Sequence, residues 1–396
     1  MSFSEWKEIK LGELLNFRRG HDLPKTKMLD GNIPVVGSNG IIGFHNEVTT
    51  KAPCLTIGRS GNIGNPCYIN KDCWAHNTSL YVDDFKGNDP KYLYYLLKTL
   101  NLGHYGGGSA VPTLNRNHIH PIEIKATINL AEQKAIAHIL STLDDKIEVN
   151  NQINKTLDNM AQAIFKQWFM DFEFPNEDGE PYKSSGGEMV ESELGMIPKG
   201  WEVKGLDEIA EFLNGLAMQK YRPTENEKSY PVLKIKELRQ GRTDENSDLC
   251  SSNIEKKYIV RDGDIIFSWS GSLLVDIWCG GKCGLNQHLF KVTSDKHDQW
   301  FVYQWNKYHL DRFVNIAKSK ATTMGHIKRK DLSDSKALIP SDELYLKAAR
   351  YQKYLFEKIM YSKIEIKRLE EIRDSLLPKL MSGEIRVPLN EEGDAS

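Results

Sequence analysis

Apolar residues recur at steps of three and four along two long stretches of this chain, one in each half. Such spacing places them on one face of an α-helix. The first stretch, residues 131–169, contains no glycine or proline, and the second covers residues 343–383. Each stretch predicts a helix of about 40 residues, which is about 60 Å long. The apolar stripes are Ile136, Ile139, Leu143, Ile147, Leu157, Ala161, Ile164 and Trp168, and then Leu355, Ile359, Ile366, Leu369, Ile372, Leu376 and Leu380.

The ends and the packing of these helices can be predicted as well. Gly383 follows the second stripe, at a place where glycine commonly terminates a helix, and Pro378 lies inside the stripe, where we expect the helix to kink or end. A helix of this length exceeds the diameter of a small domain, so it cannot bury its whole stripe there. The simplest solution pairs the two helices with each other. A linker that returns the chain to start the second half favours an antiparallel coiled coil.

Three asparagines, Asn150, Asn151 and Asn154, interrupt the first stripe at its midpoint. One interpretation is a solvated polar patch. The other is a buried polar layer that fixes the alignment of the two helices at some cost in stability. The sequence leaves both interpretations open.

The rest of each half is rich in β-forming residues and repeats the same order of segments. Residues 5–20 and 200–215 each place a tryptophan at the same distance before a glycine, and an aromatic, helix-like segment follows the short β-rich runs in both halves. Runs of this kind, bounded by Gly, Asn and Pro, are typical of short strands. We predict an α+β fold with two similar mixed α/β domains, separated by two long helices that form an antiparallel coiled coil with pseudo-two-fold symmetry. The predicted segments are domain 1 (1–129), the first helix (130–172), a Gly-, Ser- and Pro-rich linker (173–199), domain 2 (200–340), the second helix (341–385) and an acidic tail (386–396).

Composition narrows the class of protein. The chain has 396 residues, 40% of them hydrophobic, and a net charge of −2, which argues against a protein that coats nucleic acid through bulk charge but allows local basic patches. It contains no run of about 18 apolar residues and no secretory signal, so we expect a cytoplasmic protein that does not enter a membrane. Six cysteines are few for this length and are expected to be reduced.

Three stretches carry a resemblance to a known family: 164-IFKQWFMDFEFP-175, 194-LGMIPKGWEVKGLDEI-209 and 374-DSLLPKLMSGEIRV-387. Together with the duplicated order of segments, they make the whole chain resemble the specificity subunits of type I restriction–modification systems. The resemblance implies two target recognition domains on an antiparallel coiled coil. It also implies a chain without catalysis or a cofactor of its own, which selects double-stranded DNA for partner methyltransferase subunits, two in number, that bind S-adenosylmethionine and methylate adenine. Motor-nuclease subunits can join such a complex.

The duplication itself agrees with a split DNA site. Two DNA-reading domains on a stiff spacer would read two short words separated by unread base pairs, because successive major-groove faces lie about 34–36 Å apart. The two halves differ in sequence, so we expect two different words and an asymmetric site. Shortening both helices by one turn should then alter the gap and leave the words unchanged.

Several polar residues in glycine-rich or basic loops are candidates for DNA contact, because Arg and Asn can read base edges while Lys and hydroxyl groups bind phosphates. An ordinary β-turn or a solvated loop explains each of them about as well. The candidates in domain 1 are Arg59, Asn62, Asn77, Ser109, Thr113, Asn115 and Arg116. Those in domain 2 are Trp269, Ser270, Asn286, Gln287, Lys318, Lys320, Thr322, Thr323, His326, Lys328 and Arg329.

Other features favour structural roles. The tetrapeptide 65-NPCY-68 resembles an adenine methyltransferase motif, but its third position differs and no glycine-rich cofactor loop precedes it. Cys279 and Cys283, with His288 after them, lack the spacing of a zinc site. The aromatic residues Phe165, Trp168, Phe169 and Phe172 are expected to pack within the chain rather than on a partner. Rival functions are a self-sufficient DNA methyltransferase or nuclease and a coiled-coil scaffold that never contacts DNA.

Overall fold

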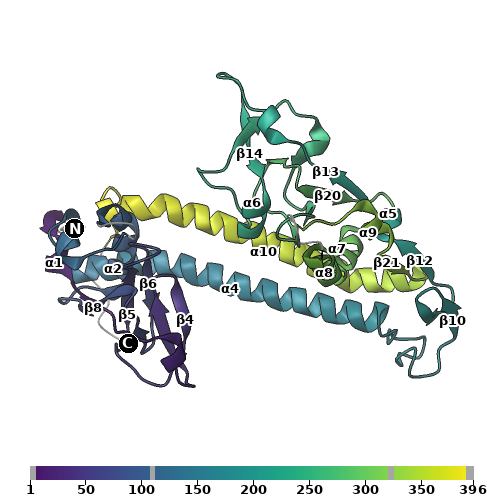
Figure 1. Cartoon of the computed structure of the whole chain (residues 1–396), viewed down its shortest axis with the longest axis horizontal. Helices are drawn as coiled ribbons and strands as arrows, with labels where there is room; N and C mark the ends of the chain where they lie inside the picture. The colour runs from purple at the N-terminus through teal and green to yellow at the C-terminus, as the bar shows by residue number, and fades with distance from the viewer. Residues whose placement is uncertain (1–5, 108–111, 320–324, 389–396) are drawn as a thin grey trace. The chain divides into compact units, whose positions relative to one another are not determined.

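The computed structural model describes residues 6–107, 112–319 and 325–388. The chain divides into two compact units, Met1–Lys146 with Leu369–Ser396, and Ile147–Arg368. Each unit contains one globular domain and one portion of each long helix, α4 and α10 (Figure 1). The predicted domain boundaries therefore do not coincide with the compact units, because each long helix contributes to both.

Unit 1 contains short strands and helices before α4. They are β1 (Trp6–Lys10), α1 (Leu11–Leu14), β2 (Asn16–Arg19), η1 (Lys25–Lys27), β3 (Ile33–Gly37), β4 (Gly40–His45), β5 (Cys54–Gly58), β6 (Pro66–Ile69), β7 (Trp74–Ala75), β8 (Ser79–Asp84), α2 (Pro90–Thr99), η2 (Leu102–Tyr105), α3 (Arg116–Ile119) and β9 (Glu123–Thr127). The long helix α4 (Leu130–Phe169) follows.

Unit 2 repeats this order with additions. Its elements are β10 (Met189–Ser192), β11 (Gly195–Pro198), β12 (Glu202–Gly205), α5 (Leu206–Ile209), β13 (Glu211–Asn214), η3 (Met218–Lys220), β14 (Ser229–Leu233), α6 (Ile235–Gln240), β15 (Leu249–Ser251), η4 (Lys256–Tyr258), β16 (Ile259–Val260), β17 (Ile265–Ser268), β18 (Leu274–Ile277), β19 (Cys283–Leu285), β20 (Leu289–Thr293), α7 (Gln299–Tyr308), α8 (Leu310–Ser319), α9 (Arg329–Ser333) and β21 (Lys336–Ile339). The long helix α10 (Asp342–Ser382) follows.

The sheets of the two domains have corresponding strand orders, with β16 as an additional strand in domain 2, which confirms the predicted duplication. The sheet β2-β8-β5-β6 of domain 1 matches β13-β20-β17-β18 of domain 2, and β4-β3-β7 matches β15-β14-β19-β16. The central strands fix the register, because Gly58 pairs with Ser79 in domain 1 and Ser268 pairs with Leu289 in domain 2. Asn77 is therefore equivalent to Gln287, and the residue before it, His76, to Asn286.

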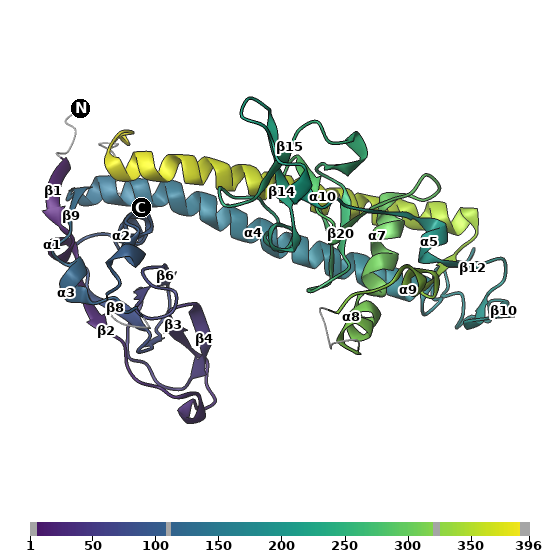
Figure 2. The same cartoon turned by 45° about the horizontal axis from the view of Figure 1, so that its top comes forward.

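The long helices pack antiparallel in each unit, and both views show them side by side (Figures 1 and 2). In unit 1, Asp144 of α4 bonds Arg373 of α10 at 2.8 Å. In unit 2, the backbone carbonyl of Ala161 accepts a hydrogen bond from the fully buried Gln352 at 2.8 Å. The residues of the predicted stripes are mostly buried or half-buried, but Ile372 is 48% exposed and does not belong to the packed face.

Two details of the helices differ from simple expectations. Asn150 is buried and donates to Glu365 at 3.0 Å, so it forms a buried polar contact between the helices, whereas Asn151 is exposed. Of the two outcomes expected at Pro378, a kink or an end, the end does not occur, because α10 continues to Ser382; the kink stays a prediction. A proline removes only one backbone hydrogen bond here, and the buried Leu380 and Met381 hold the last turn in the core of unit 1. Gly383 then adopts φ +73°, as a helix-terminating glycine does.

Residues 173–199 do not form a loose linker. They contain the β10–β11 hairpin, and Phe174 and Ile197 are buried in the core of unit 2. In that core Phe174 stacks on Trp201 with ring centroids 5.6 Å apart, and Phe172 meets the same indole edge-on. The aromatic residues at the end of α4 therefore pack within the chain, as predicted.

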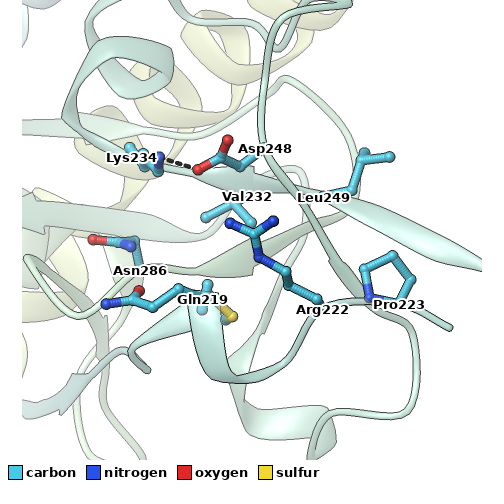
Figure 3. Close-up of a pocket in the computed structure, with 9 residues that line it drawn as sticks. Gln219, Arg222, Pro223, Val232, Lys234, Asp248, Leu249 and Asn286 are labelled. Carbon is cyan, nitrogen blue, oxygen red and sulfur yellow. Dashed lines mark hydrogen bonds and ion pairs between the residues drawn. The ribbon is translucent and has the colours of Figure 1, made fainter.

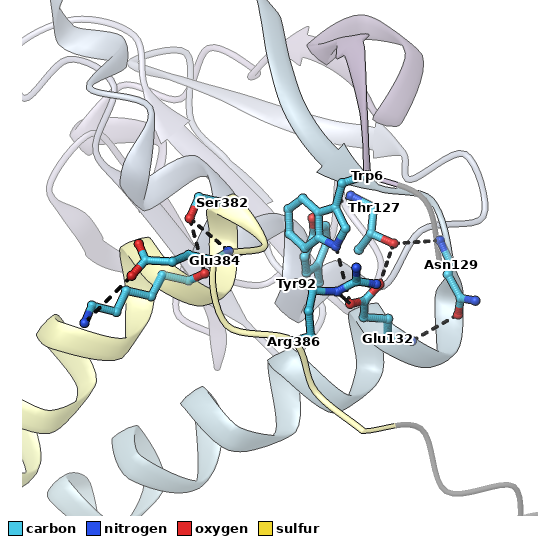
Figure 4. Close-up of polar contacts among 9 residues, drawn as sticks. Trp6, Tyr92, Thr127, Asn129, Glu132, Ser382, Glu384 and Arg386 are labelled. Atoms are coloured by element: carbon cyan, nitrogen blue, oxygen red, sulfur yellow. Dashed lines mark hydrogen bonds and ion pairs between the residues drawn. The ribbon is translucent and has the colours of Figure 1, made fainter. Parts of the chain in front are cut away.

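In unit 1, polar contacts join the start of the domain to the end of α10, where unit 2 has aromatic packing (Figure 4). Glu132, in the first turn of α4, is only 1% exposed. Its carboxylate accepts hydrogen bonds from Arg386 Nε at 2.8 Å, Thr127 Oγ1 at 3.0 Å and Trp6 Nε1 at 3.3 Å. A Cβ at Gly383 would approach the Trp6 ring to 2.8 Å, so the end of α10 lies directly on this indole. In each unit, the tryptophan that opens the domain packs against the end of the other half's long helix.

Candidate nucleic-acid interface

The candidate residues of domain 1 converge around the turn after β5. Gly58 N donates to Asn65 O at 3.0 Å and Gly64 N donates to Gly58 O at 2.8 Å, which closes a tight turn that presents the exposed Asn62. Arg59 is half-buried and anchored by its backbone N–H to Thr78 O at 2.8 Å, while its Nη1 donates to Asn77 O at 3.4 Å. Arg59, Asn62 and Asn77 therefore lie around one turn, and their contact with DNA stays a prediction.

The loop after Gly107 joins the same face. Ser60 pairs with Thr113 in an isolated antiparallel bridge, and Leu114 N donates to Arg59 O at 2.8 Å. Asn115 caps α3 by accepting from Asn117 N at 3.0 Å, so its carbonyl oxygen already has a structural use. Ser109 lies outside the described residues.

The equivalent face of domain 2 is aromatic. Trp269 occupies the position of Arg59, and its Nε1 donates to Asn214 Oδ1 at 3.0 Å. Its ring lies 6.0 Å from that of His288 and 6.3 Å from that of His326. Ser270 is buried and its hydroxyl bonds His288 Nδ1 at 2.9 Å.

The described residues of the basic segment of domain 2 lie partly in helices. Lys318 belongs to the last turn of α8, while Lys328 caps α9 and Arg329 is its first residue. All three are exposed, as is His326. The remaining candidates of this segment lie outside the described residues: Lys320, Thr322 and Thr323.

One pair of candidates has the same structural role in both domains. Arg116 donates to the backbone carbonyl of Phe17 at 3.2 Å, and Arg329 donates to that of Phe212 at 3.3 Å. Phe17 and Phe212 are themselves equivalent residues, since each pairs with the matching valine of the next strand. These arginines therefore help to hold the loop against the sheet, and their contact with DNA stays a prediction.

A cavity beside Asn286 was not anticipated from the sequence (Figure 3). Asn286 is 6% exposed, and Gln287, its half-buried neighbour, bonds His288 at 3.3 Å. Lys234 and Asp248 form an ion pair at the cavity. The lining residues are Met218, Gln219, Arg222, Pro223, Val232, Lys234, Asp248, Leu249 and Asn286. The close polar and basic residues in 219–222 were the signal that could have revealed it.

The cysteines and the tetrapeptide have local environments of their own. Cys279 and Cys283 are buried, which raises the pKa of their thiols to about 11 and about 12. Cys54 and Cys73 form a disulfide, which the expectation of reduced cysteines did not include. No group of three or more His, Cys, Asp or Glu residues suited to a metal occurs in the described part of the chain. Residues 66–68 lie on β6, at the edge of its sheet.

No helix within the described ranges combines the length and apolar character that a membrane crossing requires.

Comparison with known proteins gives a consistent result. A family model described as "Type I restriction modification DNA specificity domain" matches residues 3–159 and 198–371. The specificity subunit of the type I restriction enzyme MjaIX from Methanocaldococcus jannaschii is 34% identical over 312 residues, which are 75% of this chain and 69% of that protein. The specificity subunit of the HindI enzyme from Haemophilus influenzae is 24% identical over 463 residues, covering 96% of this chain and all of that protein. A crystal structure of the type I restriction–modification S subunit from M. genitalium has the same fold, with a TM-score of 0.61, 19% identity and 96% of both chains covered.

Proposed function

This chain belongs to the type I restriction modification DNA specificity domain family, and on that premise we propose that it recognises double-stranded DNA for partner subunits that modify and cleave it. In this proposal the chain has no catalytic role. Domain 1 and domain 2 each read one word of an asymmetric, bipartite site. S-adenosylmethionine binds to methyltransferase partners, two of them per complex, which methylate adenine, and a motor-nuclease subunit can join them.

The observation that supports this proposal most is that the two domains share their backbone framework but differ in the side chains on the candidate DNA face. Arg116 and Arg329 make equivalent hydrogen bonds in the two domains, whereas Arg59 and Trp269 differ at equivalent positions. A shared framework positions the DNA similarly in each domain, and different side chains on it select different bases.

Two exposed apolar stripes on the long helices support docking of the methyltransferase partner. Val149, Ile153 and Met160 recur on one face of α4, and Tyr354 and Tyr361 recur on one face of α10, all between 44% and 62% exposed. Such residues are enriched at the centres of protein interfaces. We propose that the modification subunit binds here.

The test mixes the purified chain, with and without its methyltransferase subunit, with DNA fragments and labelled S-adenosylmethionine. We expect methyl transfer and sequence-selective DNA binding only from the complex. Methyl transfer by the chain alone would instead support the self-sufficient methyltransferase, and a complex that binds all DNA equally would support the scaffold.

Docking is tested in the same preparation by size-exclusion chromatography. Ile153→Glu and Tyr361→Glu should each weaken assembly at least tenfold, because a charge would be buried in the interface. Asn151→Glu, on an exposed position of the opposite face of α4, is the matched control and should assemble normally.

A further inference from the structure

The cavity beside Asn286 has a volume of about 380 Å³ and lies within unit 2. It is bounded by the segment from η3 to Pro223 on one side and by strands β14 and β15 on the other. Met218 and Val232 are buried and form apolar walls, while Gln219, Arg222 and Leu249 are exposed at its rim. A cavity with apolar walls and a few convergent polar groups is the usual form of a ligand site.

Asn286 is the one strongly buried polar side chain in this lining. Its backbone N–H donates to Leu233 O at 3.2 Å and its Oδ1 accepts from His288 N at 3.3 Å, so the amide is held in one orientation. Within the described ranges, its Nδ2 has no hydrogen-bond acceptor. This nitrogen is not fully enclosed by protein, so it can donate to a group that enters the cavity.

The charges at the rim favour an electron-rich ligand. Asp248 forms an ion pair with Lys234. This lysine, and to a smaller extent Arg222, holds the pKa of Asp248 below its usual range. Two cations therefore share one carboxylate. Since Lys234 already bonds that carboxylate, the Arg222 guanidinium keeps donors for another acceptor, and Figure 3 shows it pointing into the cavity.

In domain 1, the side chain at the equivalent position has all its hydrogen-bonding groups paired within the protein. His76 corresponds to Asn286, since His21 pairs with His76 as Leu216 pairs with Asn286. Both nitrogens of His76 are engaged, Nδ1 with Thr78 Oγ1 at 2.8 Å and Nε2 with Leu23 O at 3.2 Å. Unpartnered donors at this position are therefore a property of domain 2.

We infer that this cavity is a subsite for a guanine in the half-site read by domain 2, with Asn286 Nδ2 and the Arg222 guanidinium donating to its O6 and N7. The assignment follows from the donors, because both major-groove groups of guanine are acceptors and arginine bonds them bidentately. It rests on the proposed function and adds to it which residues read one base of the second word. A phosphate is also an acceptor, so the test must separate a base contact from a backbone contact.

The experiment measures methylation by the complete complex on a library of DNA substrates randomised over both half-sites. Arg222→Lys keeps the charge but removes the planar fork, and Asn286→Ala removes the amide. Each should reduce the preference for guanine at one position of the second half-site by about 5- to 100-fold, the range of one good base contact. The first half-site should be unchanged. Lys220→Ala, an exposed neighbour that does not line the cavity, is the control.

The outcomes are distinguishable. Equally reduced methylation of all sequences would indicate a phosphate contact and overturn the inference. An unchanged guanine preference in Arg222→Lys would also overturn it. Arg222 is exposed, so this variant is not expected to misfold. If the unaltered complex shows no sequence preference, the proposed function itself fails and the inference with it. Melting temperatures of each variant complex separate a loss of fold at Asn286→Ala from a loss of base contact.

Discussion

Both units contain a junction between a domain and a long helix, but the side chains that form it differ. In each, the tryptophan that opens a domain packs on the end of a long helix that belongs to the other half of the sequence. Unit 2 fills this junction with aromatic rings around Trp201, whereas unit 1 uses a buried carboxylate, Glu132, held by Arg386 and Trp6. A duplicated fold therefore preserves the geometry of a junction while its energetic basis diverges, and the two junctions should respond differently to mutation.

The largest effect should come from the aromatic junction. Trp201 is 7% exposed, so Trp201→Ala should destabilise unit 2 by about 3–5 kcal/mol, the usual cost of truncating a buried aromatic residue. Trp6 is half-buried, and Trp6→Ala should cost less. Hydrogen exchange of amides in β12 and β13, compared with those in β1 and β2, measures each unit separately. Equal losses in both units would remove the contrast.

The polar junction should depend on charge balance. Arg386→Ala leaves the buried Glu132 carboxylate without its cation; because Arg386 is 25% exposed, we expect about 2–3 kcal/mol rather than the full cost of a broken buried pair. The double variant Glu132→Leu/Arg386→Met should recover much of this stability, since no buried charge remains. Lys379→Ala, on the exposed end of α10, serves as the control in chemical denaturation. A double variant less stable than Arg386→Ala would contradict this explanation.

The sequence predicted what depends on local pattern and repetition. The stripes with Ile147 and Ile359 gave the paired helices, and the repeated order of segments gave the corresponding sheets. It did not predict the Glu132–Arg386 contact, because 254 residues separate the two and nothing local marks them as partners. Glycine chemistry correctly marked the end of α10 at Gly383, whereas an end at Pro378 does not occur because packing of buried neighbours outweighs the loss of one hydrogen bond.

The candidate DNA residues show the same division. The sequence marked Arg59, Asn77 and Thr113 one by one, from their turns and strand ends, but their meeting on one face depends on contacts between distant segments. The cavity at Asn286 was missed because it forms between segments far apart in the sequence, and the equivalence of Asn286 with His76 depends on strand pairing that the sequence does not show.

Substitutions on the candidate DNA face of each domain should change the recognition of only one half-site. Arg59→Ala should relax one position of the first half-site by about 1–3 kcal/mol, because a guanidinium contact to a base is lost, and should leave the second word intact. Trp269→Ala should act only on the second word. The same substrate library reports both, and a variant that alters both words would show that the faces are not independent.

The smallest effect concerns pH. Burial, with a smaller contribution from nearby cations, lowers the pKa of His309 and His297 in unit 2 and of His120 in unit 1 below the usual 6.5; the hydrogen bond to the Lys336 carbonyl opposes this at His309. The unfolded chain then takes up protons before the folded one, so stability should fall as pH drops below 6.5 and level off below the folded pKa values. Denaturant midpoints at pH 7.5 and 5.5 should differ more for unit 2, and His309→Asn should reduce that difference. A unit 2 that is more stable at pH 5.5 would contradict the assignment.

Sequencing the methylome of cells that express this chain with its methyltransferase partner, against cells that lack it, tests the central claim most directly. We expect methylated adenines within one asymmetric motif made of two unlike words and an unread gap. A palindromic or uninterrupted motif, or no change in methylation, would contradict the idea that two different faces on one duplicated framework read the DNA.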